Sequence, residues 1–439
     1  MSSLMLVISL AACLLLADTA AGGVDETKSL QARLDAAAAE GGGVVTVPAG
    51  SHVVGGLRLR SNVELHLDEG ATLVFTDDLE DRLPPVRSSY SGIECLTYSP
   101  LVYAFGVTNV AITGKGTLTA RTALWESWTN WDWKHRPSEN IASFATLYRW
   151  GENDVPVEAR DTTRYCSRTM RPVFIQFNRC RGVRLEGVRI RNPPCWTVHL
   201  LHSEDVVIRG LDLFGRLKNS DGIDVEATRN VLIENCRLDQ RDDGFVIKSG
   251  RDRDGRRRSV PTENVEIRNC HVAGAITLLG IGSEVSGGVS NVWMHDCSAD
   301  VCSSRALQLK TSRRKGAYIK DIRIENIVCG EAPIGFGIDT DVEYQYRPFP
   351  ASATNMPTLI ENVTVRNFRI RKVRDFLRIL GDADRPVRSL RIEDCEAEAV
   401  SGEPLVCENA ELTLANCRVA GKGLLEMTPQ VNHTRKDEY

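Results

Sequence analysis

The stretch VLIENC at residues 231–236 returns, with small changes, as VEIRNC at 265–270 and VWMHDC at 292–297. Apolar and polar residues alternate in these stretches, which is the pattern of a half-buried β-strand. An Asn or Asp and then a Cys or another apolar residue follow, which indicates a turn. Further copies begin at residues 183, 206, 322, 363, 390 and 412. Strands that recur in this way, with no helical pattern between them, are typical of a parallel β-helix.

The spacing of the copies supports one coil rather than several domains. Successive first positions are 22 to 41 residues apart, and looser copies at residues 63–67 and 110–114 extend the series toward the N-terminus. We interpret the longer intervals as loops inserted on one side. A β-sandwich or barrel would favour two-residue hairpin turns between strands, and few are present. The sequence therefore predicts an all-β fold, a single solenoid over residues 22–427.

The ends of such a coil need covers, because an open end exposes the core. Residues 29–39 (SLQARLDAAAA) are rich in Ala and Leu, and three glycines follow at 41–43. This pattern predicts a short N-terminal capping helix that stops at the glycines. The last residues, 428–439, are polar and are expected to form a C-terminal tail.

Charge and hydropathy restrict the partners and the location. The net charge of −4 gives no reason to expect nucleic acid as a partner. No apolar run of about 18 residues follows the N-terminus, so no transmembrane segment is expected. The apolar run from Leu4 to Ala17 predicts a signal peptide over residues 1–21 and hence a secreted or periplasmic protein. LAAC at 10–13 also resembles a lipoprotein box, so anchoring at Cys13 is the alternative.

Five cysteines share the last position of the repeat: Cys236, Cys270, Cys297, Cys395 and Cys417. Val, Leu, Ile or Phe occupies this position in other copies, so cysteine behaves there as a small buried apolar residue. Stacked strands about 4.8 Å apart also fit poorly with the Cβ separation of about 3.8 Å in a disulfide. We therefore expect mostly free, buried thiols.

Three aspartates are the main candidates for chemistry. Asp221 lies in NSDGID (219–224), and Asp242 and Asp243 follow 21 and 22 residues later in RDDGFVIKSG (241–250). This spacing is about one turn of the coil, so stacking would bring the carboxylates together. Grouped carboxylates suit acid and base catalysis at a glycosidic bond, and a solvated acidic turn is the alternative. Asp242 and Asp243 can share a cleft only through a turn or bulge, because neighbouring strand residues point to opposite faces.

These motifs resemble those of the family 28 glycoside hydrolases, the polygalacturonase family of right-handed, pectin-lyase-like β-helices. The resemblance runs from about residue 27 to about residue 371. It rests on segments in family order: GGGVVTVPAG (41–50), RP (171–172), NPPCWTVH (192–199), NSDGID (219–224), RDDGFVIKSG (241–250), GSEVSGGV (282–289) and RALQLKT (305–311). It implies a hydrolase that cleaves galacturonic-acid-containing pectic polysaccharide or oligosaccharide. We expect a monomer without a cofactor, and no metal site, since neither His nor Cys spacings match a ligand set.

The resemblance also implies roles for single residues. Water would attack the anomeric carbon in one inverting displacement, with Asp242 as the general acid and Asp221 and Asp243 holding and deprotonating the water. Crowded carboxylates cannot all ionise freely, so one is expected to keep its proton. Room for water implies an acid and a base about 6.5–9.5 Å apart. The expected substrate-binding residues are Asn219, Asp224, His199, Lys248, Arg305, Gln308, Lys310 and Tyr344.

Two positions depart from the family pattern. Ala275-Ile276-Thr277 stands where the family has Gly-His-Gly, so the active-site histidine is absent, and Gln308 replaces an arginine that accompanies Lys310. Glutamine cannot supply a charged fork for a carboxylate. A cleft with one cation should prefer a different or partly neutral sugar beside the cleavage point. Rhamnogalacturonan, decorated pectin and an exo-acting oligosaccharide activity therefore stay open as substrates or modes of action.

Other interpretations also stay open. RDRDGRRR (251–258) could attract an anionic polysaccharide or form a solvated loop. His199 could line the substrate site or be an ordinary hydrogen-bonded histidine. Five tryptophans could stack on sugars, although covering the flank of the coil is favoured: Trp125, Trp128, Trp131, Trp133 and Trp150. The rival functions are a polysaccharide lyase whose calcium the aspartates could bind, and a non-catalytic glycan-binding β-helix.

Overall fold

The computed structural model describes residues 24–77, 83–129, 138–166, 170–342, 354–420 and 423–427. The expected signal peptide, Cys13 and the C-terminal tail lie outside these residues, as do Tyr344, Trp131 and Trp133. The predictions for them stay predictions. No helix in the described part of the chain is long and apolar enough to cross a membrane.

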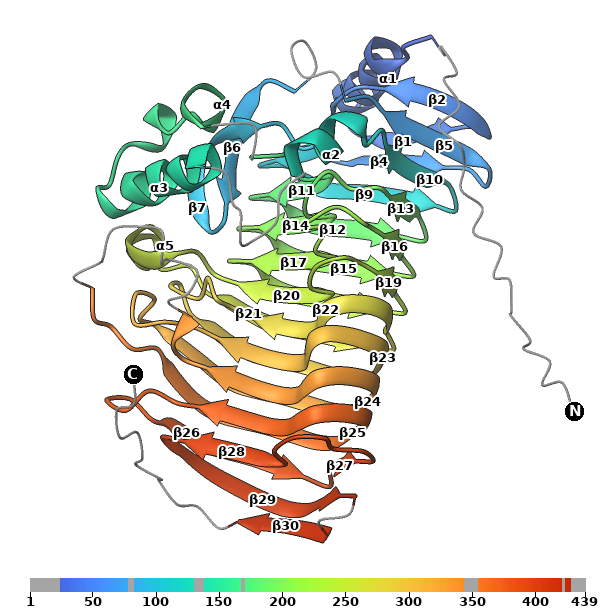
Figure 1. Ribbon diagram of the computed structural model, residues 1–439. Helices are drawn as coiled ribbons and strands as arrows, with labels where there is room; N and C mark the ends of the chain where they lie inside the picture. Colours follow the sequence, from blue (N-terminus) through green and yellow to red (C-terminus); the bar gives the residue numbers. More distant parts are fainter. Residues whose placement is uncertain are drawn as a thin grey trace, which may run out of the picture.

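The described chain winds into a column of stacked parallel strands, which confirms the predicted β-helix (Figure 1). Each turn contributes to three faces. The first face holds β1 (Gly43–Val47), β4 (Val63–Leu67), β9 (Thr108–Gly114), β12 (Arg181–Glu186), β15 (Glu204–Arg209), β18 (Arg229–Glu234) and β21 (Thr262–Arg268). The second holds β2 (Gly50–Val54), β5 (Ala71–Phe75), β10 (Thr117–Ala120), β13 (Arg189–Arg191), β16 (Asp212–Phe214) and β19 (Arg237–Asp239). The third holds β3 (Leu57–Arg58), β8 (Val102–Phe105), β11 (Ile175–Asn178), β14 (Val198–Leu201), β17 (Ile223–Glu226) and β20 (Phe245–Lys248).

Toward the C-terminus the strands run around the corners of the column without a break. The long strands are β22 (His271–Ile281), β23 (Val289–Lys310), β24 (Tyr318–Asp339) and β25 (Leu359–Leu380). The coil ends with β26 (Val387–Glu393), β27 (Glu396–Ala397), β28 (Leu405–Glu408), β29 (Ala410–Val419) and β30 (Gly423–Met427). The last strand, β30, runs antiparallel to β29 and so differs from the parallel pairs before it.

The repeat found in the sequence is the unit that stacks. Its first residues pair from turn to turn, as Val206 with Val231, Val231 with Val265, and Val265 with Val292. All four are almost fully buried. The fifth residue of each copy has a positive φ, which Asn, Asp and Gly adopt with the least strain. These residues are Gly187, Gly210, Asn235, Asn269, Asp296, Asn326, Asn367, Asp394 and Asn416.

The sixth position of the repeat faces the core. The five cysteines expected to be buried there are between 0% and 3% exposed. All twelve cysteines in the described residues are free thiols, which confirms the prediction.

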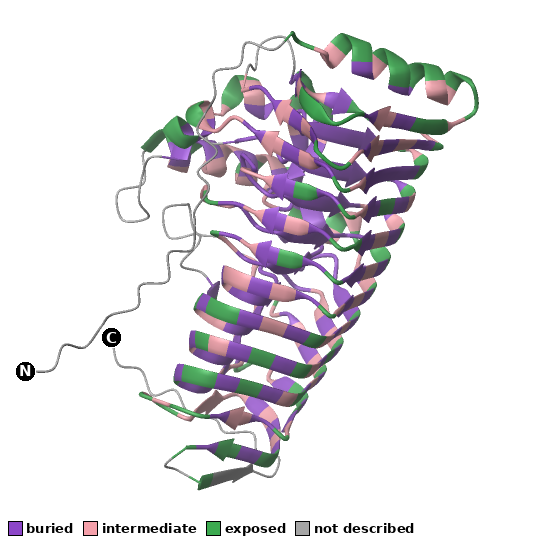
Figure 2. Cartoon of the chain, turned by 90° about the vertical axis from the view of Figure 1, so that its right-hand side faces the viewer, coloured by how far each residue is buried: buried purple, intermediate pink, exposed green. Residues whose placement is uncertain are grey.

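The N-terminal end of the column is covered as predicted. The helix α1 (Thr27–Ala39) spans the residues expected to form the cap and buries Leu30 and Leu34. Figure 2 shows this helix across the end of the stack, with its outer side exposed and purple core residues filling the turns below.

The inserted loops form a second, smaller body on one side of the coil (Figure 1). It consists of the hairpin β6 (Pro85–Tyr90) and β7 (Ile93–Tyr98) and of the helices α3 (Ser138–Glu152), η1 (Val157–Ala159), α4 (Thr162–Tyr165) and α5 (Asp252–Arg258). The inserted helix α2 (Ala123–Thr129) instead packs on the main core of the coil. A separate apolar cluster joins this body to the coil through Tyr90, Leu147 and Trp196. Trp125 and Trp128 are buried in the main core, which confirms the covering role favoured for them.

Candidate active site

The three candidate aspartates lie in turns that lead from the second face to the third. Asp221 precedes β17 by two residues, and Asp243 precedes β20 by two residues. Because Ile223 pairs with Phe245, the two aspartates occupy equivalent positions on consecutive turns, and the Gly222 N–H donates to the Asp243 carbonyl at 2.9 Å. Asp242 and Asp243 lie in the loop between β19 and β20, outside the regular strands. This confirms the expected turn.

The carboxylates of Asp221, Asp242 and Asp243 converge. One oxygen from each lies within 4.8 Å of the others. These oxygens are close together because the groups come from adjacent residues and from turns one strand spacing apart. The expected separation of about 6.5–9.5 Å between the acid and base groups stays a prediction. Asp221 and Asp243 are buried, and Asp242 is half-buried. Oxygens of this kind could also coordinate a cation.

Their surroundings separate the three acids by protonation state. Burial and the charges of Asp221 and Asp243 raise the pKa of Asp242 well above its usual range. Burial raises the pKa of Asp221 to about 6, a rise that Lys248 limits and Asp243 increases. For Asp243, burial is outweighed mainly by the positive charge of Lys310, with the Thr277 hydroxyl also favouring the charged form, so its pKa is lowered. The geometry thus favours a protonated Asp242 beside an ionised Asp243.

Two lysines hold this charge distribution in place. Lys310 Nζ lies 3.0 Å from Asp243 Oδ2. Lys248 Nζ is buried, 2.5 Å from Asp224 Oδ1 and 3.5 Å from Asp221 Oδ2. It also lies 4.0 Å from the centre of the Trp196 ring. Burial would lower the pKa of Lys248, but Asp224 and Asp221 raise it above its usual value, so the amine stays charged.

His199 lies one turn before Asp224 and in register with it, as the sequence predicted. It is fully buried, its Nδ1 is 2.9 Å from Gln176 Nε2, and its Nε2 is 3.0 Å from Glu226 Oε2. Burial lowers its pKa, and Glu226 offsets this only in part. The structure therefore shows the hydrogen-bonded histidine of the alternative interpretation. Direct contact of His199 with a substrate stays a prediction.

Comparison with known proteins agrees with this arrangement. The model for glycosyl hydrolases family 28 matches residues 101–417, which include all three aspartates and both lysines. This chain belongs to glycosyl hydrolases family 28.

Individual relatives are similar over long segments. A probable polygalacturonase of Vitis vinifera is 26% identical over 325 residues, which is 71% of this chain and 59% of that protein. An exo-poly-α-D-galacturonosidase of Dickeya chrysanthemi is 24% identical over 296 residues, which is 61% of this chain and 46% of that protein. The chain thus spans about half the length of these two curated relatives.

A solved structure matches almost the whole fold. The crystal structure of an exopolygalacturonase from Thermotoga maritima has a TM-score of 0.83 and 34% sequence identity, and the match covers 92% of this chain and 90% of that one. The predicted fold class, a right-handed parallel β-helix, is confirmed.

The sequence comparison placed Ile276 at the position of the family histidine, but the structure shows a different neighbour for Asp243. Phe245 pairs with Leu279, so Thr277 follows Asp243 in the stack, and its side chain is fully buried there. Ile276 is half-buried and donates its backbone N–H to the Asp242 carbonyl at 2.9 Å. The pairing between β19 and β22 shifts between Leu238 and Asp239, ahead of this point. Such a shift cannot be read from the residue types, so Thr277 was missed.

The other expected substrate-binding residues have distinct settings. Asn219 accepts a hydrogen bond from Arg171 Nη2 at 2.9 Å, and its N–H donates to Asp242 Oδ2 at 3.2 Å. Gln308 pairs with Gly280 on one side and with Gly337 on the other. Arg305 and Lys310 are partly exposed, at 20% and 15% of their side-chain surface.

The segment RDRDGRRR differs from the solvated loop of one sequence interpretation, and its attraction of an anionic polysaccharide stays a prediction. Residues 252–258 form the helix α5, whose acids have buried partners from distant segments. Asp252 pairs with Lys315 at 2.6 Å, and Asp254 pairs with Arg160 at 2.8 Å. The solvated-loop prediction is therefore wrong, because these ion pairs fix the segment to the insertion and to the coil.

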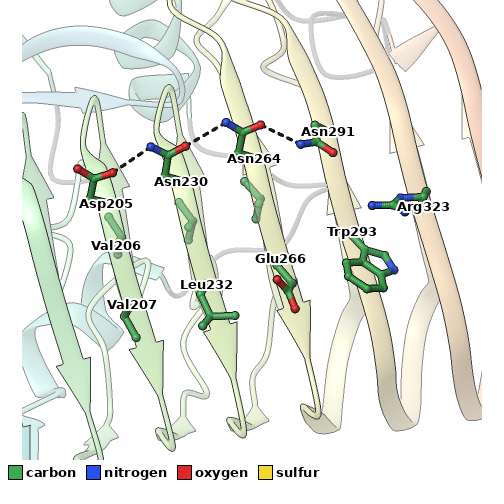
Figure 3. Close-up of a pocket in the computed structure, with 12 residues that line it drawn as sticks. Asp205, Val206, Val207, Asn230, Leu232, Asn264, Glu266, Asn291, Trp293 and Arg323 are labelled. Carbon is green, nitrogen blue, oxygen red and sulfur yellow. Dashed lines mark hydrogen bonds between the residues drawn. The ribbon is translucent and has the colours of Figure 1, made fainter.

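A shallow groove of about 530 Å³ lies elsewhere, on the outer side of β15, β18, β21, β23 and β24 (Figure 3). Asn230 donates to Asp205 at 2.9 Å, Asn264 to Asn230 at 3.0 Å, and Asn291 to Asn264 at 2.8 Å. These four residues, which we call the amide ladder, satisfy one another along the stack. The groove is on the first face of the coil, so it is separate from the aspartate cluster.

Proposed function

We propose that this protein hydrolyses galacturonic-acid-containing pectic chains. The observation that carries the proposal is the cluster of Asp221, Asp242 and Asp243, with oxygens within 4.8 Å of one another and unlike protonation states. Family membership supports the reaction class, and the names of the relatives support the substrate class.

In the proposed reaction, Asp242 donates its proton to the glycosidic oxygen as the sugar–oxygen bond breaks. Asp221 and Asp243 hold a water and take its proton as it attacks the anomeric carbon. Lys310 keeps Asp243 ionised, and Lys248 favours the ionised form of Asp221. We propose inversion of the anomeric centre. The anomer released first, measured by proton NMR immediately after mixing, tests this against retention.

The decisive assay measures new reducing ends on polygalacturonate and rhamnogalacturonan with the wild type and Asp242→Asn. Cleavage that depends on Asp242 supports the proposal, and cleavage of rhamnogalacturonan alone would move the substrate to that polymer. An ultraviolet signal of unsaturated uronide, lost on removing calcium, would instead establish a lyase. Saturable glycan binding without products would establish a binding protein.

We further propose that the enzyme acts from a chain end. Trp196 precedes Asp221 in the stack, and its ring lies 6.1 Å from that of Tyr90, at the end of β6. The turn of the β6–β7 hairpin, next to Tyr90, is held in place because Arg251 donates to the carbonyls of Ser91 and Gly92 at 2.6 and 2.8 Å. If these side chains and the hairpin cover the N-terminal side of the aspartates, a long polysaccharide chain would be stopped from passing through the substrate site.

The product distribution tests chain-end action. Release of monogalacturonate from the first minutes, with little loss of polymer viscosity, is the expected result. Early appearance of mixed oligogalacturonates together with a rapid fall in viscosity would contradict it.

A secreted or periplasmic location is proposed with this function, because the apolar segment 4–17 has the character of a signal peptide. Fractionation of the source cells tests that location.

A further inference from the structure

The stacked row that contains the aspartates continues beyond them. Asp221, Asp243 and Thr277 occupy equivalent positions on successive turns, and Thr277 pairs with Arg305 on the next. Arg305 is therefore two strand spacings, or about 10 Å, from Asp243 along the column. This places it within reach of a sugar close to the cleavage point, on the side away from Tyr90 and Trp196.

The side chain of Arg305 lies over the neighbouring strand β24. A Cβ added at Gly337 would lie 3.1 Å from Arg305 Nε and 3.2 Å from Arg305 Cδ. Gly337 pairs directly with Gln308. Arg305 thus lies over the strand next to Gln308, and the missing side chain at position 337 makes the room for it.

Gln308 is buried between two glycines of the neighbouring strands. Gly280 flanks it in β22 and Gly337 flanks it in β24. A Cβ at Gly280 would lie 3.3 Å from Asp243 Oδ2. The side chains of Asp243 and Arg305 thus lie over the two glycines on either side of Gln308, which places the carboxylate and the guanidinium on the same side of these strands.

Arg305 is also available for a new partner. Among the described residues, its ion-pair partner is Asp339, with Nη2 and Oδ2 3.8 Å apart, and Nη1 donates to Ser304 Oγ at 3.3 Å. By contrast, Arg160 is fully buried and only 2.8 Å from Asp254. A loosely paired, partly exposed guanidinium can form a bidentate pair with a carboxylate.

We propose that Arg305 binds the carboxylate of a uronic acid next to the cleavage point and supplies the second cation that Gln308 lacks. Lys310 is the first cation, two residues along from Gln308. This inference rests on the proposed function. It revises the sequence-based expectation of a site with one cation: the site retains two and selects acidic rather than neutral sugars.

The experiment compares Arg305→Met and Arg305→Lys with the wild type on oligogalacturonates and on their methyl esters. For Arg305→Met we expect KM on the free acid to rise about 10- to 100-fold, with a smaller change in kcat and no rise on the ester. Arg305→Lys should recover part of the loss. Adding Gln308→Arg to Arg305→Met should also recover it, because the charge returns next to the same position.

Two controls separate this inference from a structural effect. Arg323→Met removes a guanidinium that lies over the Trp293 ring on the first face, and it should leave KM unchanged. Thermal melting shows whether each variant is folded. Equal losses on acid and ester, or an unchanged KM on the acid, would overturn the role of Arg305.

Failure of the proposed function would look different. A wild type that cleaves no galacturonan overturns that function before Arg305 is tested. Calorimetry with trigalacturonate on Asp242→Asn then decides the binding role by itself. Affinity that Arg305→Met weakens, more strongly at low salt, supports the inference, and affinity that it leaves unchanged, or no binding at all, overturns it.

Discussion

The amide ladder and the aspartate cluster are two products of the same stacking of turns. In the ladder, Asn230, Asn264 and Asn291 each donate to the residue one turn earlier and so satisfy one another. A carboxylate can only accept hydrogen bonds unless it is protonated. The stacked Asp221 and Asp243, with Asp242 beside them, therefore cannot satisfy one another. A retained proton and two lysines offset the repulsion between their charges. Repetition of a side chain therefore stabilises the fold where that side chain can hydrogen-bond to its own copy. Where it cannot, as for the stacked acids, repetition shifts pKa values.

Converting the acid Asp242 to an amide should have the largest effect. Asp242→Asn should lower kcat about 1000-fold, because proton donation to the leaving oxygen is lost. The Asp242→Asn variant should have a larger free energy of unfolding than the wild type at neutral pH. The raised pKa of Asp242 means that folding opposes its ionisation, so the wild type loses stability as pH rises above the usual carboxyl pKa.

Reducing-end kinetics and melting curves from pH 4 to pH 8 check both effects of Asp242→Asn. The stability gain should shrink toward low pH, where Asp242 is protonated in both states of the chain. Asp212→Asn is a control, because that acid lies on the outer side of β16 and is paired with Arg191 at 2.7 Å. Full activity of Asp242→Asn would remove Asp242 as the acid.

Removing a compensating cation comes next in size. In Lys248→Met the pKa of Asp221 should rise above its value of about 6, because a positive charge 3.5 Å away is gone. The acidic limb of the kcat profile should then move to higher pH, with a loss of about tenfold or more below pH 6. Lys320→Met is the matched control, since that lysine also lies over an aromatic ring, Tyr318, on the first face. An acidic limb that stays in place would show that Lys248 does not act on Asp221.

A smaller effect is expected from one hydroxyl. Thr277→Val keeps the shape of the side chain but removes the hydroxyl that helps to lower the pKa of Asp243, so this pKa should rise. We expect kcat to fall about tenfold near pH 5, because a polar group that favours the charged form is lost. The control is Thr113→Val, which loses a 2.5 Å bond to Glu64 far from the aspartates. A pH profile identical to that of the wild type would contradict a role for Thr277.

The ladder itself should affect stability alone. Asn264→Ala removes two amide hydrogen bonds and places alanine at a φ of +58°, at a cost of about 1–2 kcal/mol in free energy of unfolding. Asn264→Gly loses the same bonds but tolerates the positive φ, so urea denaturation should show a smaller loss. kcat should be unchanged in both variants. A large fall in kcat would mean that the two regions are coupled.

The regular part of this fold was predictable because its causes are local. The alternation of apolar residues, an Asn, Asp or Gly that accepts a positive φ, and a buried cysteine or other apolar residue recur from copy to copy, so the coil and its register follow from them. The convergence of Asp221 with Asp243 was predictable for the same reason.

The rest depends on departures from the repeat. The pairing of β19 with β22 shifts between Leu238 and Asp239, and the pairing of Phe245 with Leu279 then puts Thr277, rather than Ile276, beside Asp243. A shift of one residue exchanges the two sides of a strand. Arg305 turns over a neighbouring strand because Gly337 leaves space, which only the packed structure reveals. The helix α5 was missed because its buried ion pairs join residues 63 and 94 positions apart.

The unpaired cysteines decide how the chain can be produced. Because all twelve in the described residues are free and most are buried, the native state requires no oxidative folding and no disulfide isomerase. A reducing cytoplasm and an oxidising compartment should give the same fold. The hazard lies before folding is complete, when an oxidant could join thiols that the finished coil keeps apart.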